Sequence, residues 1–258
     1  MLEKEEKRKS EEARYRLWNV FLHLLALVLL GFSLFPMLFF FYTVWKALAV
    51  FPAALKILAV SFSVAFGYFL FGVTLIGLAV FAKNLFGFKI APGLYRVYSK
   101  ESLLWMAYNA MILIVNSAFL DVFRLSPFQT LFYRLMGAKI GKGVHINTSG
   151  LADLSMLEIG DNTLIGGGVA LICHASERGF LVLAPTKIGR NVSIGLGSVV
   201  LPGCEIGDGA SIAPSSLLPR GTKIPPKAIW GGNPLRDLRA ERRAAGDGTE
   251  KPDSETAP

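Results

Sequence analysis

Hydrophobic positions follow two different patterns along this chain, and the change falls near residue 130. Before it, long apolar runs alternate with short polar segments; beyond it, single aliphatic residues recur at a fixed interval among polar and glycine positions. Long apolar runs are typical of membrane helices, and a fixed interval is typical of a repeat protein. We therefore expect a membrane domain over 1–130, a repeat domain over 131–236, and a short helix with a disordered tail over 237–258.

Two apolar runs in the first domain are long enough to cross a bilayer. The first extends from Leu17 to Trp45 without a charged residue, and the second covers 53–82 with Lys56 as its only charge. A spanning helix needs about 20 residues. Because the link between the runs is short, they predict a transmembrane α-helical hairpin. Pro36 should kink or break the first helix, and glycines at 67, 72 and 77 should allow another helix to approach the second.

A third apolar run, 103–120, is less uniform. It contains Asn109, Asn116 and Ser117, which fall near one face of a helix, and it ends at Asp121. A third span would place the repeat domain on the opposite side of the membrane from the outer ends of the first two runs. We favour an amphipathic interfacial or re-entrant helix, and two versus three spans stays open.

The second half repeats every six residues. Aliphatic residues stand at seven consecutive positions of this period, and an upstream set keeps it with one extra residue between Ile146 and Ile159. This period fits neither a helix nor an alternating strand. It fits a short strand plus a turn, three of which close one coil of about eighteen residues. The seven consecutive positions are Ile188, Ile194, Val200, Ile206, Ile212, Leu218 and Ile224.

The largest break in the period lies between Leu171 and Ile188, where eleven residues are inserted. Insertions in repeat proteins form loops and often contribute to the binding face. His174 stands at the start of this insertion, so the 174–187 loop is the first place to look for chemistry.

Composition supports the membrane assignment. The chain is 52% hydrophobic and 18% charged, against about a quarter charged in ordinary soluble domains. The formal net charge of +8 could indicate nucleic acid. Because basic residues cluster beside the apolar runs, we assign them to membrane topology and lipid contact, and we expect no nucleic-acid partner. The excess of basic residues at the outer ends of the hairpin predicts that both ends face the cytoplasm, together with the repeat domain that follows.

Cysteine and histidine are too scarce for a metal site. Cys173 and Cys204 form no disulfide framework or CxxC motif, and we expect them to be reduced. A γ-class carbonic anhydrase also winds as a β-helix, but it needs three histidines on zinc. Only His145 and His174 lie in the repeats, and they are far apart, so that interpretation is rejected.

The repeat domain resembles the hexapeptide-repeat acyltransferases, which are left-handed parallel β-helices. Three motifs carry the resemblance: His174 with its loop and the re-entry Pro185-Thr186-Lys187-Ile188-Gly189; the coil 194–203; and Ile224-Pro225-Pro226 leading to Gly232-Asn233-Pro234. The entry 132–141 and the exit 216–221 are more similar still to the membrane-embedded C-terminal modules of poly-lysine-synthetase-like nonribosomal peptide synthetases. The resemblance covers about two thirds of the chain.

The resemblance implies a membrane-bound homotrimeric acyltransferase. Acyl transfer from a thioester needs a general base for the acceptor hydroxyl or amine, and the resemblance assigns this role to His174. Acetyl-CoA, or another acyl-CoA, would be the donor, and no metal is implied. Two alternatives remain: aminoacyl or peptidyl transfer from a carrier-protein thioester, and a non-catalytic trimeric membrane scaffold.

The resemblance also suggests binding residues around His174. Asp153 is the main candidate for holding the acceptor, with a turn-capping role as its alternative. Two further groups are implied for acceptor and donor. The acceptor group adds His145, Asn147 and Glu177. The donor group comprises Gly197, Ser198, Ala213 and Ser215, with Arg220, Lys223 and Arg236 for the coenzyme A phosphates.

Overall fold

The computed structural model describes residues 2–88 and 90–244. The chain divides into two compact units. The first comprises residues 1–139 with two short segments, 152–157 and 173–184; the second holds residues 140–151, 158–172 and everything from residue 185 onward. Residues 245–258, where the sequence predicts a disordered tail, lie outside the described part.

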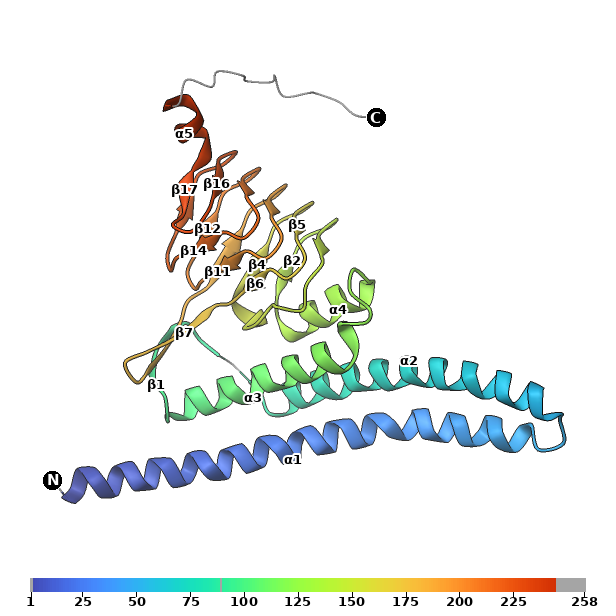
Figure 1. Ribbon diagram of the computed structural model, residues 1–258. Helices are drawn as coiled ribbons and strands as arrows, with labels where there is room; N and C mark the ends of the chain where they lie inside the picture. The colour runs from blue at the N-terminus through green and yellow to red at the C-terminus, as the bar shows by residue number, and fades with distance from the viewer. Residues whose placement is uncertain (1, 89, 245–258) are drawn as a thin grey trace. The chain divides into compact units, whose positions relative to one another are not determined.

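Two long helices dominate the first unit. α1 (Leu2–Ala47) and α2 (Ala53–Leu85) run side by side in opposite directions, joined by a short turn (Figure 1). They contain the predicted segments 17–45 and 53–82, and α1 continues through Pro36 without ending. Both are long and apolar enough to cross a membrane, as is the helical stretch Lys100–Leu120. Large apolar side chains stay exposed along α1, for example Leu17, Phe32 and Phe35, each about two-thirds exposed or more.

The remaining helices of this unit pack against α2. α3 (Lys100–Val115) continues directly into a π-helical turn, η1 (Asn116–Leu120), and α4 (Pro127–Met136) follows. Ser99 caps α3 by accepting a hydrogen bond from the Ser102 amide at 3.2 Å. The core of the unit consists of side chains with no exposed surface, among them Leu75, Met111, Val115, Phe119, Phe132, Tyr133 and Met136.

The sequence predicts that another helix packs closely against α2 at three glycines, and the structure shows such close packing at two of them. A Cβ on Gly72 would overlap the Phe119 ring, and one on Gly67 would lie 3.0 Å from Met37 Cγ. Nothing lies within 4 Å of the corresponding point on Gly77. Gly72 thus lets η1 pack directly on α2, while Gly77 has no such role.

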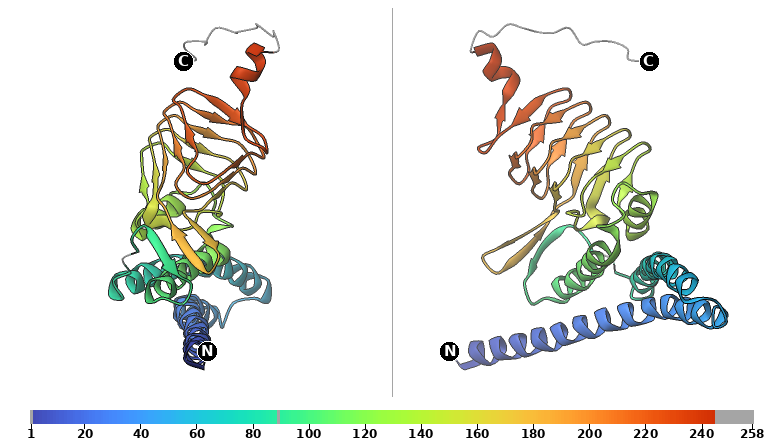
Figure 2. Two further views of the ribbon diagram at one scale, coloured as in Figure 1. Left: turned by 90° about the vertical axis from the view of Figure 1, so that its left-hand side faces the viewer. Right: turned by 45° about the vertical axis from the view of Figure 1, so that its right-hand side comes forward.

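The second unit is a parallel β-helix (Figure 2). Its strands form three sheets, with the order β17-β16-β13-β10-β5-β3 in one, β14-β11-β6 in the second and β15-β12-β9-β4-β2 in the third. A final helix, α5 (Leu238–Ala244), follows. The strand bounds are β2 Lys139–Ile140, β3 His145–Ile146, β4 Leu157–Ile159, β5 Leu164–Ile165, β6 Ala170–Leu171, β9 Thr186–Ile188, β10 Ser193–Ile194, β11 Val199–Val200, β12 Glu205–Ile206, β13 Ser211–Ile212, β14 Leu217–Leu218, β15 Lys223–Ile224, β16 Ile229–Gly231 and β17 Arg236–Asp237.

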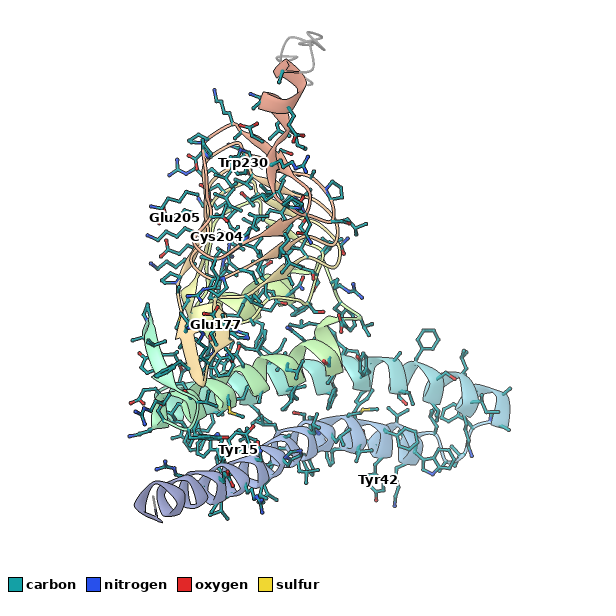
Figure 3. All side chains as sticks on the ribbon, turned by 60° about the vertical axis from the view of Figure 1, so that its left-hand side comes forward. Tyr15, Tyr42, Glu177, Cys204, Glu205 and Trp230 are labelled. Atoms are coloured by element: carbon teal, nitrogen blue, oxygen red, sulfur yellow. The ribbon has the colours of Figure 1, made fainter. Side chains whose placement is uncertain are left out.

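The six-residue period is confirmed by the strand register. Ile194 aligns with Ile165 in one direction and with Ile212 in the other, and Val200 aligns with Leu171 and Leu218 in the same way. All six side chains are at most 2% exposed. Each aliphatic residue of the period therefore stacks on its equivalent one coil away, and these stacks form the core. Neighbouring residues alternate, so Cys204 is buried while Glu205 lies on the outside (Figure 3).

The eleven-residue insertion differs from the expected loop. It forms an antiparallel hairpin of β7 (His174–Glu177) and β8 (Phe180–Leu183), which turns at Arg178 and Gly179, both with positive φ. β1 (Gly93–Arg96) adds a third strand beside β8. The expectation was wrong because β8 is a run of four apolar residues in which alternate side chains, Leu181 and Leu183, are buried, and β8 pairs with a strand on each side.

Candidate active site

His174 and Asp153 form the centre of the candidate site, and both belong to the first unit. His174 is the first residue of β7, and its Nδ1 lies 2.6 Å from Asp153 Oδ2. Asp153 precedes the short helix η2 (Leu154–Met156) and has a left-handed backbone, with φ 54°. This conformation is uncommon for a residue other than glycine and occurs often at functional positions.

The Asp153 carboxylate is almost fully enclosed and accepts hydrogen bonds on both oxygens. Its side chain is 1% exposed. Oδ1 accepts from Trp105 Nε1 at 2.5 Å and from Asn109 Nδ2 at 2.9 Å. Oδ2 accepts from the Cys173 amide at 2.9 Å and faces His174. A buried carboxylate is costly unless such donors compensate it, so this set of contacts fixes both its position and its orientation.

Asn109 and Trp105 hold Asp153 from α3. Asn109 Oδ1 also accepts a hydrogen bond from the Asp153 amide at 2.9 Å. Asn109 therefore binds both the backbone and the side chain of Asp153. The Trp105 ring meets the His174 ring edge-on, with 4.7 Å between their centroids. The imidazole is therefore held by a hydrogen bond at one nitrogen and by an aromatic ring at its side.

This geometry determines which nitrogen of His174 can act. An ionised carboxylate only accepts hydrogen bonds, so Nδ1 carries the proton that it donates to Asp153. In the neutral imidazole, Nε2 then keeps its lone pair. The His174 side chain is 27% exposed, so solvent reaches part of the side chain. The arrangement can take a proton from a bound hydroxyl or amine.

Sequence reasoning missed Trp105 and noted Asn109 only as a polar residue on one face of an apolar helix. The available signal was their spacing of four residues, which puts both side chains on the same face of α3. Nothing in the sequence links that face to Asp153, which lies 44 residues beyond Asn109.

The other acceptor-side candidates are divided between the two units. Glu177 is exposed at the far end of β7, level with Phe180 in the hairpin. His145 is exposed on β3, and Asn147 is the first residue after that strand; both belong to the second unit. Cys173 is fully buried and contributes its amide to Asp153, so its thiol faces away from solvent.

The donor-side candidates all belong to the second unit. Ser198 is fully buried, and its hydroxyl donates to the Ala213 carbonyl at 3.1 Å. Gly197 and Ser215 both have positive φ and occupy equivalent corners of neighbouring coils, where the Ser215 amide donates to the Leu196 carbonyl. Lys223 lies 3.7 Å from Glu205, and Arg236 lies 3.3 Å from Glu241; all four of these side chains are largely exposed. Arg220 is exposed too.

Among the described residues there is no group of three His, Cys, Asp or Glu side chains that could hold a metal ion.

Comparison with known proteins connects the β-helix to a family. Residues 185–220 match the family model described as bacterial transferase hexapeptide (six repeats). The delta-poly-L-ornithine synthetase of Acinetobacter baumannii is 27% identical over 45% of this chain and 9% of its own length. The inferred acetyltransferase YvoF of Bacillus subtilis is 28% identical over 52% of this chain and 82% of its own length.

A third relative is the galactoside O-acetyltransferase of Escherichia coli, 32% identical over 38% of this chain and 55% of its own length. The chain thus spans very different shares of the relatives that it matches, and less than two thirds of two of these three. The match to the family model lies within the repeats of the second half of the chain.

Proposed function

We propose that this chain, whose β-helix is related to the hexapeptide-repeat transferases, is a membrane-bound acyltransferase in which His174 is the general base. The acyl group would be transferred from a thioester, acetyl-CoA first among them, to a hydroxyl or amine of a membrane-associated acceptor. The observation that carries the proposal is the contact between His174 Nδ1 and the enclosed Asp153 carboxylate, which leaves Nε2 as a base. The acetyltransferases among the relatives support the reaction class.

In the proposed reaction, His174 Nε2 removes the proton from the acceptor as its oxygen or nitrogen attacks the thioester carbonyl. A new C–O or C–N bond forms, and the carbonyl electrons move onto oxygen. When the tetrahedral intermediate collapses, the C–S bond breaks and the imidazolium returns its proton to the departing sulfur. The Asp153 carboxylate stabilises the positive charge that His174 carries between these two steps.

For Asp153 we propose a positioning role. Its oxygens already accept from four donors, including His174, and its side chain is 1% exposed. This favours a carboxylate that orients the base over one that binds the acceptor. His145, Asn147 and Glu177 remain candidates for acceptor contacts.

The donor is proposed to bind along the β-helix. Gly197, Ser198, Ala213 and Ser215 would line its path through backbone groups. The exposed cations Arg220, Lys223 and Arg236 would meet the phosphates of coenzyme A, which arginine binds well through paired N–H groups. A homotrimer and a cytoplasmic β-helix complete the proposal. The three long apolar helices support the membrane location.

The test is transfer of radiolabelled acetyl groups from acetyl-CoA to a membrane lipid extract by the purified full-length protein. His174→Ala should lower the rate about 10²- to 10⁴-fold, the usual contribution of a general base. His23→Ala is the matched control, because His23 is exposed on α1 and its Nδ1 contacts only the Asn19 carbonyl of the same helix. Full activity in His174→Ala would contradict the assignment of the base.

A carrier-bound thioester is the second candidate donor. It is supported by the likeness to the delta-poly-L-ornithine synthetase. In a parallel assay, acetyl-CoA is replaced by an acyl carrier protein or a peptidyl carrier protein that holds a radiolabelled acyl group as a thioester. Transfer from the carrier alone would identify this donor, and no transfer from either donor would favour the scaffold alternative.

A further inference from the structure

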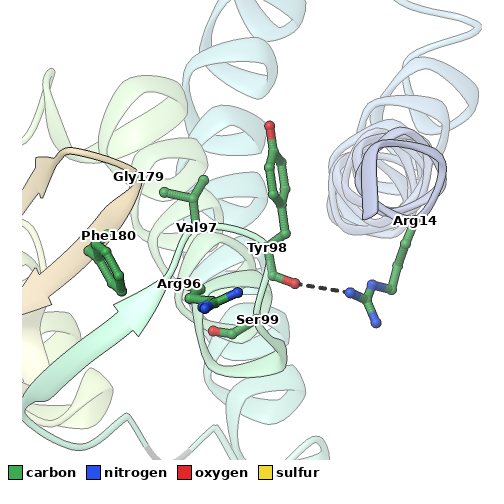
Figure 4. A pocket seen from close by; sticks show the side chains of 7 residues that line it. All are labelled: Arg14, Arg96, Val97, Tyr98, Ser99, Gly179 and Phe180. Atoms are coloured by element: carbon green, nitrogen blue, oxygen red, sulfur yellow. Dashed lines mark hydrogen bonds between the residues drawn. The ribbon is translucent and has the colours of Figure 1, made fainter. Parts of the chain in front are cut away.

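A pocket with two arginines opens in the first unit, on the opposite face of the three-stranded sheet from His174. Its volume is about 410 Å³, and it lies where β1 ends and α3 begins. Arg14 reaches it from α1 and Arg96 from β1, and the Arg14 guanidinium donates to the Tyr98 carbonyl at 3.4 Å (Figure 4). Both arginines are exposed, and neither guanidinium pairs with a carboxylate of the described residues.

The charge around this pocket favours an anion. Lys100 and Arg178, both exposed, neighbour the lining residues Ser99 and Gly179. Ser99 also caps α3, so the positive end of a sixteen-residue helix opens there. Three acidic residues lie within two positions of the lining residues: Glu12 on α1, Glu101 in the first turn of α3 and Glu177 on β7. Arg16, two positions from Arg14, is a further cation, so five cations stand against three carboxylates and the balance is positive. Paired arginines match the oxygens of a phosphate group.

An exposed apolar strip continues from the pocket along the sheet. Leu94 and Arg96 share one face of β1 because they are two residues apart. Phe180 and Val182 of β8 align with them, so all four side chains lie on that face. Leu94 is 63% exposed and Phe180 is 37% exposed, whereas Leu181 and Leu183 on the opposite face are 2% exposed. His174 aligns with Leu183 and therefore lies on the opposite face.

A cationic pocket joined to an exposed apolar strip has the chemistry of an amphiphile site. We infer that this face binds an anionic phospholipid, with its phosphate between Arg14 and Arg96 and an acyl chain over Leu94 and Phe180. The three helices long and apolar enough to cross a membrane make such a lipid available to this unit. The inference does not depend on acyl transfer, because the site and His174 lie on different faces of the sheet.

The test measures binding by the purified full-length protein in detergent, using native mass spectrometry with dioleoyl phosphatidic acid. Arg14→Gln and Arg96→Gln should each weaken binding by about tenfold or more, because a charge-assisted hydrogen bond is worth about 1.5 kcal/mol. Arg124→Gln is the control, since Arg124 is an exposed arginine of the same unit that pairs with Asp121. His174→Ala should bind the lipid like the unchanged protein.

Glycerol 1-phosphate separates a lipid from a soluble phosphate compound. It should bind at least about tenfold more weakly than phosphatidic acid, because it lacks the chains that would cover the apolar strip. Leu94→Ser should weaken the binding of the lipid and leave that of glycerol 1-phosphate unchanged. Equal binding of both compounds, or equal lipid binding by the two arginine variants and Arg124→Gln, would overturn the inference.

Discussion

At the scale of single residues, the site depends on how completely the Asp153 carboxylate is enclosed. Two of its donors, Trp105 and Asn109, come from a helix long and apolar enough to cross a membrane. These contacts tie the orientation of His174 to α3. A loss of either donor should therefore affect both stability and the proposed catalysis.

Trp105→Phe tests this dependence. The substitution removes the Nε1 donor 2.5 Å from Asp153 Oδ1 while keeping an aromatic ring beside His174. A buried carboxylate that loses one donor should cost about 1–3 kcal/mol of unfolding free energy. We expect a lower kcat with little change in the KM for the donor, because the imidazole is less well oriented. Thermal unfolding and steady-state kinetics in detergent measure the two effects.

Trp18→Phe is the matched control, because its indole nitrogen has no hydrogen-bond partner among the described atoms. Its kcat should stay at the level of the unchanged protein. If Trp105→Phe behaved like Trp18→Phe in both measurements, the role of the Nε1 donor would be refuted.

At the scale of elements, the first unit depends on one close approach between helices. Gly72 of α2 faces the buried ring of Phe119 in η1, and a methyl group there would overlap the ring. The π-helical turn sits at this contact. Small residues allow apolar helices to pack closely, and van der Waals packing is one of the forces that drive helix association in lipid.

Gly72→Ala should therefore destabilise the first unit by about 1–3 kcal/mol, because the fully buried Phe119 must move. Gly77→Ala on the same helix is the control, since nothing lies within 4 Å of its added methyl group. Both substitutions gain the same helix propensity, so their difference isolates the overlap. Unfolding in detergent measures it, and equal stability of the two variants would show that Phe119 adapts freely.

At the scale of the whole molecule, each compact unit carries one buried cysteine. Cys173 belongs to the first unit and Cys204 to the second, and both are free and fully buried. Burial raises the pKa of the Cys204 thiol above its ordinary value. A raised pKa means less thiolate at a given pH, and the thiolate is the reactive form.

Alkylation by iodoacetamide should therefore be slow for both cysteines in the folded protein and fast after denaturation. The Cys173→Ala variant keeps only Cys204, so its labelling reports on the second unit. The Cys204→Ala variant keeps only Cys173 and reports on the first unit. Labelling the two variants over a series of urea concentrations therefore follows the unfolding of each unit separately. Rapid labelling of Cys204 in the folded protein at pH 7 would contradict its burial. Mass spectrometry of the labelled peptides provides the measurement.

The periodic features could be predicted from the sequence, and the contacts between distant segments could not. The six-residue period predicted the β-helix because each coil must place an aliphatic residue at the same inward position. The hairpin of β7 and β8 was predicted as a loop, because its stability depends partly on pairing with β1, nearly 90 residues earlier in the chain. A local pattern carries no information about such a partner.

The sequence by itself determined the coil, the two long apolar helices and His174 as the candidate base. Each depends on a local pattern: a period, an uninterrupted apolar run, or a histidine at a break in the period. Only the tertiary structure decided what holds His174. Trp105, Asn109, Asp153 and Cys173 are spread over nearly 70 residues, and they meet because burying one carboxylate requires several donors at once.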